Sequence, residues 1–302
     1  MRTNVTSDTP AARARLSLLG LSVGDAFGET FFANPDVVEG LIAQRALAAE
    51  PWHWTDDTAM AVSVVEHLER FGAIQQDELA AAFVKRYHPS HGYGSTLGRA
   101  MREIRDTGAS YRDVFPALFN GQGSYGNGAA MRVAPLGAFF ADEDYDTIFE
   151  QARLSAETTH THPEGVAGAV AVAVAAAVAY QTHGATPSRA AFLEAILLHV
   201  PPSETRERLR HAARFAPGVS ARFAAEVLGT GAQVSAQDTV PFALFCAGEH
   251  LRDYEEALWQ TVSGLGDQDT TCAIAGGVVA LHVGAAGIPP AWVAAREPLD
   301  GS

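Results

Sequence analysis

The stretch from Gly264 to Thr271 places two acidic residues directly before a long apolar run. Asp267 and Asp269 are two positions apart, and two hydroxyl residues follow them. The next residues, Cys272 to Val283, are rich in alanine and valine, which predicts a buried helix. The sequence therefore predicts an acidic loop at the N-terminus of a buried helix, a position where charge has to be balanced by other groups.

A second acidic cluster, Thr55-Asp56-Asp57-Thr58, precedes another predicted helix far upstream. Apolar residues then repeat at helical spacing, and Gly72 follows as a stop signal. A threonine or aspartate at this position is ordinary helix capping. One cap needs one oxygen, however, and this cluster offers four oxygen-bearing side chains in a row. This excess favours a second role for the cluster.

Carboxylate and hydroxyl oxygens are the ligands that hard divalent ions such as Mg²⁺ prefer. Several carboxylates in one small site would repel one another without cations, so two such clusters predict metal. Two ions about 4 Å apart clamp sugar hydroxyls and activate a bridging water. The ligand candidates from the two clusters are Thr55, Asp56, Asp57, Asp267, Asp269 and Thr270.

Composition and charge narrow the classes of protein to which this chain can belong. The chain has 302 residues, of which 47% are hydrophobic, so one large core can form. Its net charge of -14 argues against a general nucleic-acid binder. The two cysteines, in apolar runs, indicate buried thiols rather than disulfides. The polar start has no apolar signal core, so we expect a cytoplasmic protein with no membrane segment.

Helical spacing recurs along the chain, whereas alternating strand patterns are missing from the sequence. We therefore predict an all-α fold, with a flexible tail over residues 1–12 and a single many-helix domain over 13–296. The first helix, predicted from Ala12, carries Gly20, Gly24 and Gly28 at intervals of four, which would let a neighbouring backbone come close. The Ala/Val run from Val166 to Tyr180 is too short and too weakly hydrophobic for a comfortable membrane span and predicts a buried helix.

Two glycine-rich loops are candidates for ligand contact. The loop from His88 to Thr96 precedes a predicted helix, where free backbone amides suit a phosphate, although this loop taken alone favours a plain turn between helices. The loop from Gly121 to Arg132 is denser in glycine, and Tyr125, Asn127 and Arg132 add an aromatic and polar groups beside it. A tight bend between helices is the alternative there.

Several short motifs, in this order and spacing, resemble the ADP-ribosylglycohydrolases, a family that includes dinitrogenase reductase-activating glycohydrolase and the ADP-ribosyl-arginine and ADP-ribosyl-serine hydrolases. The resemblance covers most of the chain. Leu265 departs from it, because a second glycine often precedes Gly266 in the family. The matching motifs are Gly24-Asp25-Ala26-Phe27-Gly28, Trp54 to Thr58, Gly126 to Arg132 with Pro135, Thr159-His160, Val240 to Ala243 and Gly266 to Thr270.

The resemblance implies an all-α domain with two Mg²⁺ ions in a cleft, where Mn²⁺ can substitute. One ion would use Thr55, Asp56, Asp57 and Asp269, and the other Asp267, Asp269 and Thr270. Glu29 lies where some members place a mobile catalytic or metal-bound glutamate. The catalytic candidates are Glu29, Asp56 and Asp267. The residues that would bind the pyrophosphate, adenosine and ribose are Gly92, Tyr93, Gly94, Ser95, Tyr125, Gly126, Asn127, Gly128 and His160.

The implied reaction is hydrolysis of the bond between ribose C1″ of ADP-ribose and a modified protein side chain, through an arginine or serine linkage. A carboxylate would act as base, and negative charge would stabilise an oxocarbenium-like sugar. The alternatives are a di-metal hydrolase of another ADP-ribose-linked or sugar-linked small substrate, and a non-catalytic ADP-ribose-binding relative. The expected partner is an ADP-ribosylated protein or small molecule, and the expected state is a monomer.

Overall fold

The centre of the molecule is a close antiparallel pair of helices, α1 (Pro10–Glu29) and α15 (Gln268–Val283). In the computed structural model, which describes residues 8–299, the predicted glycine strip of α1 faces α15. A Cβ atom at Gly24 would lie 2.2 Å from the carbonyl oxygen of Cys272, and one at Gly28 would lie 2.2 Å from that of Gln268. Only glycine permits this approach, so the strip fixes the distance between α1 and the acidic start of α15.

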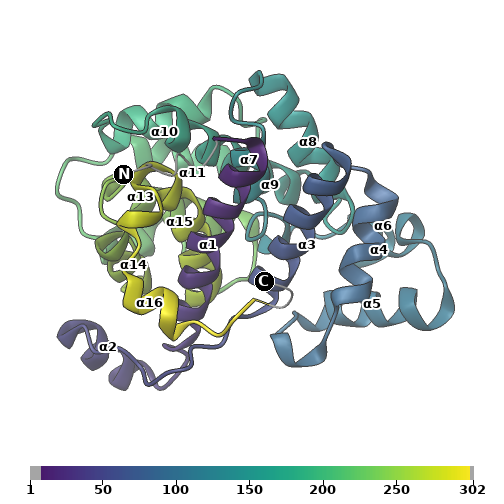
Figure 1. The fold of residues 1–302 in the computed structure, drawn as a ribbon, viewed down its shortest axis with the longest axis horizontal. Helices are drawn as coiled ribbons and strands as arrows, with labels where there is room; N and C mark the ends of the chain where they lie inside the picture. Colours follow the sequence, from purple (N-terminus) through teal and green to yellow (C-terminus); the bar gives the residue numbers. More distant parts are fainter. Residues whose placement is uncertain (1–7, 300–302) are drawn as a thin grey trace, which may run out of the picture.

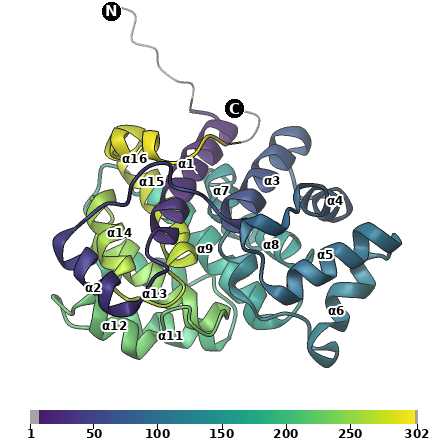
Figure 2. The same cartoon turned by 90° about the horizontal axis from the view of Figure 1, so that it is seen from below.

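The remaining helices surround this pair (Figure 1). In Figures 1 and 2, α4, α5 and α6 lie at one side of the molecule and α13 and α14 at the other, with α1 and α9 between them. The described residues contain no named strand, which confirms the all-α prediction, and they form a single compact domain. The other helices are α2 (Pro35–Gln44), α3 (Asp56–Phe71), α4 (Gln76–Arg86), α5 (Ser95–Thr107), α6 (Tyr111–Gly121), α7 (Ala134–Phe139), α8 (Tyr145–Glu157), α9 (Pro163–Gln181), α10 (Arg189–Leu197), α11 (Glu204–Ala213), α12 (Ala221–Leu228), α13 (Ala236–Glu249), α14 (Tyr254–Val262) and α16 (Pro290–Ala295), with short 3-10 turns η1 (Pro89–His91), η2 (Asn127–Ala129) and η3 (Ala285–Gly287).

Helix α9 is the buried Ala/Val helix that the sequence predicted. It has 19 residues, so it is longer than the apolar run alone, and of the described helices it is the one whose length and composition would suffice to cross a membrane. However, 78% of its apolar window is buried inside the protein, which is the behaviour of a core helix. Cys246 and Cys272 are buried and unpaired, as expected.

Several helix boundaries differ from the prediction. Helix α1 begins at Pro10 because Thr9 caps it by accepting a hydrogen bond from the Ala12 amide, so residues 10–12 of the predicted tail are helical. Residues 1–7 of that tail lie outside the described residues. Helices α6 and α12 gave no clear signal in the sequence. Pro116 lies inside α6 and Gly229 follows the short α12, which weakened the periodic pattern.

The C-terminal segment packs beyond the predicted boundary at residue 296. The Trp52 amide donates to the Ala295 carbonyl at 2.7 Å, and the Glu297 amide donates to the Trp52 carbonyl at 2.9 Å. Glu297 Oε1 also accepts from the Trp54 amide at 3.2 Å. These bonds tie the end of the chain to the segment that leads into α3, so the C-terminus helps to position the first acidic cluster.

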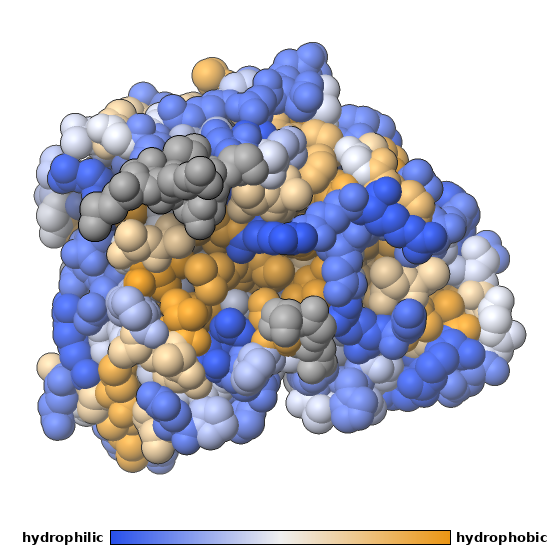
Figure 3. All heavy atoms as spheres, viewed as in Figure 1, coloured by the Kyte–Doolittle hydropathy of each residue, from blue (hydrophilic) through white to orange (hydrophobic). Residues whose placement is uncertain are grey.

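The outer surface is mixed in character. Figure 3 shows hydrophobic residues gathered over the middle of the face seen in Figure 1, with hydrophilic residues around them. Apolar atoms on the surface of a folded domain are normal and indicate no partner by themselves.

Candidate functional site

The first acidic cluster, at the start of α3, is organised by Asp25, which lies near the C-terminal end of α1. One Asp25 oxygen accepts from the Thr55 hydroxyl at 2.9 Å, and the other accepts from the Thr58 hydroxyl at 2.5 Å. The amides of both threonines also donate to the Asp25 carboxylate, at 3.0 and 3.1 Å. The Thr55 hydroxyl oxygen lies 3.2 Å from Asp57 Oδ2 and accepts from the Asp57 amide at 3.4 Å, so one of its lone pairs remains available to a cation. Asp25 therefore orients the cluster, and both of its oxygens accept hydrogen bonds from it.

The second acidic cluster, at the start of α15, is shaped by backbone. Leu265 and Gly266 have φ values of 60° and 85°, in the left-handed region that favours glycine. Leu265, the one departure from the family pattern, thus adopts the conformation that glycine would take there. The Asp267 amide then donates to the Thr230 carbonyl at 3.1 Å, and Asp267 Oδ2 accepts from Asn127 Nδ2 at 2.6 Å. A tight turn and a neighbouring loop together orient the Asp267 side chain.

The two clusters meet below the cleft. The Thr270 hydroxyl lies 3.4 Å from Asp57 Oδ2, and single carboxylate oxygens of Asp25, Asp57 and Asp269 lie within 4.8 Å of one another. Asp57 is fully buried, and its Oδ1 has no hydrogen-bond partner among the described residues. An unpartnered buried carboxylate oxygen is costly, which indicates that a positive group belongs beside it.

The pKa values of the clustered carboxylates follow from burial and mutual repulsion. Burial, followed by the charges of Asp25 and Asp267, raises the pKa of Asp56 to about 8. Burial also raises the pKa of Asp25 to about 6, against the lowering effect of its threonine donors. The pKa values of Asp57 and Asp269 are raised well above the ordinary range, first by burial and then by neighbouring carboxylates. The charged forms of these groups need a cation in the cluster.

The donor set fits a hard divalent cation. The available groups are carboxylate and hydroxyl oxygens, without thiol or imidazole, which is the chemistry of Mg²⁺ or Mn²⁺ rather than of a structural zinc site. The unpartnered Asp57 oxygen points to the same conclusion. Magnesium itself stays a prediction.

Glu29, at the last position of α1, is half-buried beside the two clusters. Burial raises its pKa, and the charges of Asp25 and Asp267 raise it further. A carboxyl group with a raised pKa near other acids is suited to proton transfer. Its catalytic role stays a prediction.

A cleft of about 460 Å³ opens above the clusters. Asp57 and Thr55 lie in the floor behind it and are buried, whereas the remaining predicted metal ligands face it. Both glycine-rich loops form its walls. The predicted site residues that line it are Asp56, Gly92, Gly94, Ser95, Tyr125, Gly126, Asn127, Gly128, His160, Asp267, Asp269 and Thr270.

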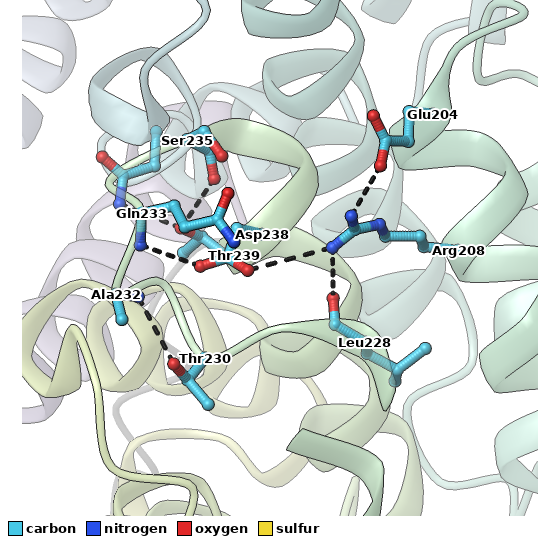
Figure 4. Close-up of polar contacts among 10 residues, drawn as sticks. Glu204, Arg208, Leu228, Thr230, Ala232, Gln233, Ser235, Asp238 and Thr239 are labelled. Atoms are coloured by element: carbon cyan, nitrogen blue, oxygen red, sulfur yellow. Dashed lines mark hydrogen bonds and ion pairs between the residues drawn. The ribbon is translucent and has the colours of Figure 1, made fainter. Parts of the chain in front are cut away.

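The loop before α13 forms another part of the rim of the cleft. Gln233 and Val234 line the cleft, and the Gln233 amide donates to Asp238 Oδ2 at 3.0 Å. Arg208 supports the loop from behind, where it donates to the Leu228 carbonyl at 3.1 Å and lies 3.8 Å from Asp238 Oδ1 (Figure 4). The Thr230 carbonyl of the same loop accepts from the Asp267 amide, so a hydrogen bond connects the rim to the second acidic cluster.

Some residues lie elsewhere than expected. The Tyr93 ring packs against Tyr87, with centroids 4.8 Å apart, and is not among the residues that line the cleft. Arg132 is fully buried, so it stands behind the glycine loop instead of beside a ligand. Asp25 was noted within a family motif but not assigned to the site, and Phe119, whose ring lies 5.7 Å from that of Tyr125 at the cleft, gave no sequence signal. The buried setting of Asp25 in an apolar glycine strip was the available clue.

Comparison with known proteins gives a consistent answer. The ADP-ribosylglycohydrolase family model matches residues 6–300. The chain is 29% identical to ADP-ribosylhydrolase ARH3 of Gallus gallus, over 95% of this chain and 89% of that one, and 28% identical to ARH3 of Homo sapiens, over 93% and 88%. It is 26% identical to ADP-ribosylarginine hydrolase Tri1 of Pseudomonas putida, over 96% and 75%.

A solved structure titled ADP-ribosylglycohydrolase-related protein complex superposes with a TM-score of 0.60. It covers 95% of this chain and 93% of its own, at 24% identity, and so supports the fold. The family match spans almost the whole sequence, including both acidic clusters and both glycine-rich loops. The chain belongs to the ADP-ribosylglycohydrolase family and is a hydrolase of glycosidic bonds.

Proposed function

We propose that this enzyme removes ADP-ribose from a modified protein side chain, with an arginine or serine linkage, by Mg²⁺-dependent cleavage of the C1″ bond. The observation that carries the proposal is the meeting of two acidic clusters, with an unpartnered Asp57 oxygen, under a cleft walled by glycine-rich loops. ARH3 and Tri1 carry ADP-ribosylhydrolase names, which supports this class of substrate.

The residues that would hold the ions are Thr55, Asp56, Asp57 and Asp269 for one and Asp267, Asp269 and Thr270 for the other. When bound, the ions would supply charge to ribose hydroxyls and acidify a water. The glycines of the two loops that line the cleft leave room for a diphosphate to approach backbone amides. Tyr125, 38% exposed at the cleft, offers an aromatic face to a base.

Glu29 is the proposed base. Its raised pKa keeps it closer to the working pH than a solvated glutamate, which increases its efficiency in proton transfer. It lies at the end of α1 beside Asp267 rather than in the buried floor. The negative charge of the surrounding carboxylates would favour an oxocarbenium-like sugar during cleavage.

The test is turnover of defined ADP-ribosyl-arginine and ADP-ribosyl-serine peptides, side by side, with Mg²⁺ and with EDTA. We expect one peptide to be cleaved with Mg²⁺ and neither with EDTA. Folded Asp56→Asn and Asp267→Asn should lose turnover, and Glu29→Gln should lower it about a hundredfold while keeping Mg²⁺ binding. Full activity of Asp56→Asn, or cleavage only of a small ADP-ribose-linked compound, would contradict the proposal.

A further inference from the structure

Arg132 is a fully buried cation with no carboxylate at ion-pair distance among the described residues. Its Nη2 donates to the Ser155 carbonyl and to the Thr159 hydroxyl, each at 2.9 Å, and its guanidinium lies 4.4 Å from the centroid of the Phe83 ring. Burying a charge without an ion pair is expensive, and Arg132 Nε has no hydrogen-bond partner among the described residues, so the bonds made by Nη2 carry much of the compensation. Of these partners, the Thr159 hydroxyl is the one that connects Arg132 to the cleft.

Thr159 connects Arg132 to His160. The Thr159 hydroxyl oxygen, which accepts from Arg132, also lies 2.7 Å from His160 Nδ1. Thr159 is only 1% exposed, so solvent is not a ready acceptor for its proton. A guanidinium can only donate, which leaves the hydroxyl proton to be donated to His160 Nδ1. The opposite arrangement would leave a buried hydroxyl proton without an acceptor.

This direction of donation determines the tautomer of His160. If Nδ1 accepts, the ring proton of the neutral imidazole lies on Nε2. Burial, followed by the charge of Arg132, lowers the pKa of His160 to about 3, which keeps the ring neutral at physiological pH. His160 lines the cleft, and Cβ atoms built on Gly126 and Gly128 would lie 3.2 and 3.1 Å from its Nε2. The two glycines therefore leave space at the edge of the ring that carries the donor.

We propose that Arg132, acting through Thr159, holds His160 as a neutral imidazole whose Nε2–H is offered to an anionic oxygen of the ligand. A donor backed by a buried positive charge suits an acceptor-only oxygen, such as that of a diphosphate, better than a hydroxyl. Arg132 and Thr159 are positioning residues, because both are buried behind the wall of the cleft. The identity of the ligand rests on the function proposed above.

The test reads the tautomer directly. Nitrogen-15 NMR of the labelled protein distinguishes a protonated from an unprotonated ring nitrogen, and we expect His160 to carry its proton on Nε2. Thr159→Val keeps the shape but removes the acceptor and donor, so it should give a mixture of tautomers and weaken ADP-ribose binding about tenfold. Thr159→Ser should restore both readouts, which a loss of packing alone would not explain.

Thr158→Val is the matched control. Thr158 is equally buried and also accepts from Arg132, at 3.4 Å, but its own proton goes to the Ser155 carbonyl at 2.7 Å, and its hydroxyl forms no hydrogen bond with His160. Its removal should leave the His160 spectrum and ADP-ribose affinity unchanged, even if the melting temperature falls. Equal effects of Thr158→Val and Thr159→Val on the spectrum would overturn the inference.

Two further outcomes separate this inference from the proposed function. Normal turnover of ADP-ribosylated peptides together with a protonated Nδ1 in the wild-type protein would overturn the inference alone. A wild-type Nε2–H resonance that does not move on saturation with ADP-ribose would overturn the ligand contact. Absence of both binding and turnover in the wild-type protein would instead overturn the proposed function, whatever the tautomer.

Discussion

The starts of α3 and α15 carry similar residues but are built in opposite ways. At the start of α3, a single side chain, Asp25, binds two amides and two hydroxyls of the turn, and Asp57 is fully buried. At the start of α15, the turn depends on left-handed backbone at Leu265 and Gly266, and Asp267 takes its partners from other loops. One cluster is fixed by the core, and the other by the walls of the cleft.

This difference assigns distinct physical tasks to the two clusters. The α3 cluster is held by the closely packed α1 and α15 pair, so its oxygens are preorganised before any ligand arrives. The α15 cluster is bonded to Asn127 in the glycine-rich loop and to Thr230 in the rim loop. A ligand that moves either loop would therefore also shift Asp267, whereas Asp57 would stay in place.

The largest expected effect comes from breaking the fixed cluster with Asp25→Asn. An amide of the same size presents a donor to groups that are themselves donors, so at least one buried amide or hydroxyl loses its acceptor. We expect the free energy of unfolding to fall by about 3 kcal/mol and Mg²⁺-dependent turnover to be lost. Denaturant unfolding and the peptide assay measure these two effects.

Asp144→Asn is the matched control for that variant. Asp144 caps α8 on the exposed surface by accepting from the Thr147 amide at 2.7 Å. Asparagine caps helices about as well as aspartate, so stability and turnover should stay close to the wild-type values. An Asp25→Asn protein as stable and active as this control would show that Asp25 does not organise the cluster.

The second effect concerns metal and pH. Folded-state pKa values above the ordinary range, such as about 8 for Asp56, mean that the metal-free folded protein binds more protons than the unfolded chain. The contribution of these groups to stability should therefore be fully present below the ordinary carboxyl pKa and be lost as pH rises toward 8. Mg²⁺ replaces those protons, so at a hundredfold excess over its Kd it should add about 2.7 kcal/mol at pH 8 and less at pH 5.5.

Thermal unfolding with Mg²⁺ and with EDTA at both pH values measures this effect. Asp57→Asn is the companion variant, because it removes one of the most strongly perturbed carboxyl groups. It should unfold at a higher temperature than the wild-type protein in EDTA and gain less from Mg²⁺. An equal Mg²⁺ shift at pH 5.5 and pH 8 would contradict the view that repulsion within the cluster is relieved by the metal.

The comparison also explains what the sequence predicted. The acids at 56, 57, 267 and 269 stand next to periodic apolar runs, so their position at buried helix starts followed from local pattern. The glycine strip of α1 likewise predicted close packing, which the contacts of Gly24 and Gly28 confirm. These features are encoded by residues near one another in the chain.

What the sequence left open depends on distant contacts. The role of Asp25 arises only when α1 lies beside α3, and the burial of Arg132 arises only when Phe83 and Thr159 close around it. Tyr93 likewise packs against Tyr87. The spacing of residues in the sequence does not determine the direction of that side chain. Pairings of this kind are set by the assembled core.

The smallest expected effect tests whether Asn127 orients Asp267 in the α15 cluster or only packs the glycine-rich loop. Asn127 Nδ2 donates to Asp267 Oδ2 at 2.6 Å and to the Thr239 hydroxyl at 3.0 Å. Asn127→Ala removes both bonds and should lower Mg²⁺ affinity about tenfold, because the partners that orient a ligand tune its affinity. Thr239→Val removes only the second bond, so by calorimetric titration it should keep wild-type Mg²⁺ affinity while its melting temperature falls. If both variants bound Mg²⁺ equally well, Asn127 would only pack the loop, and the α15 cluster would be as independent of the cleft walls as the α3 cluster is.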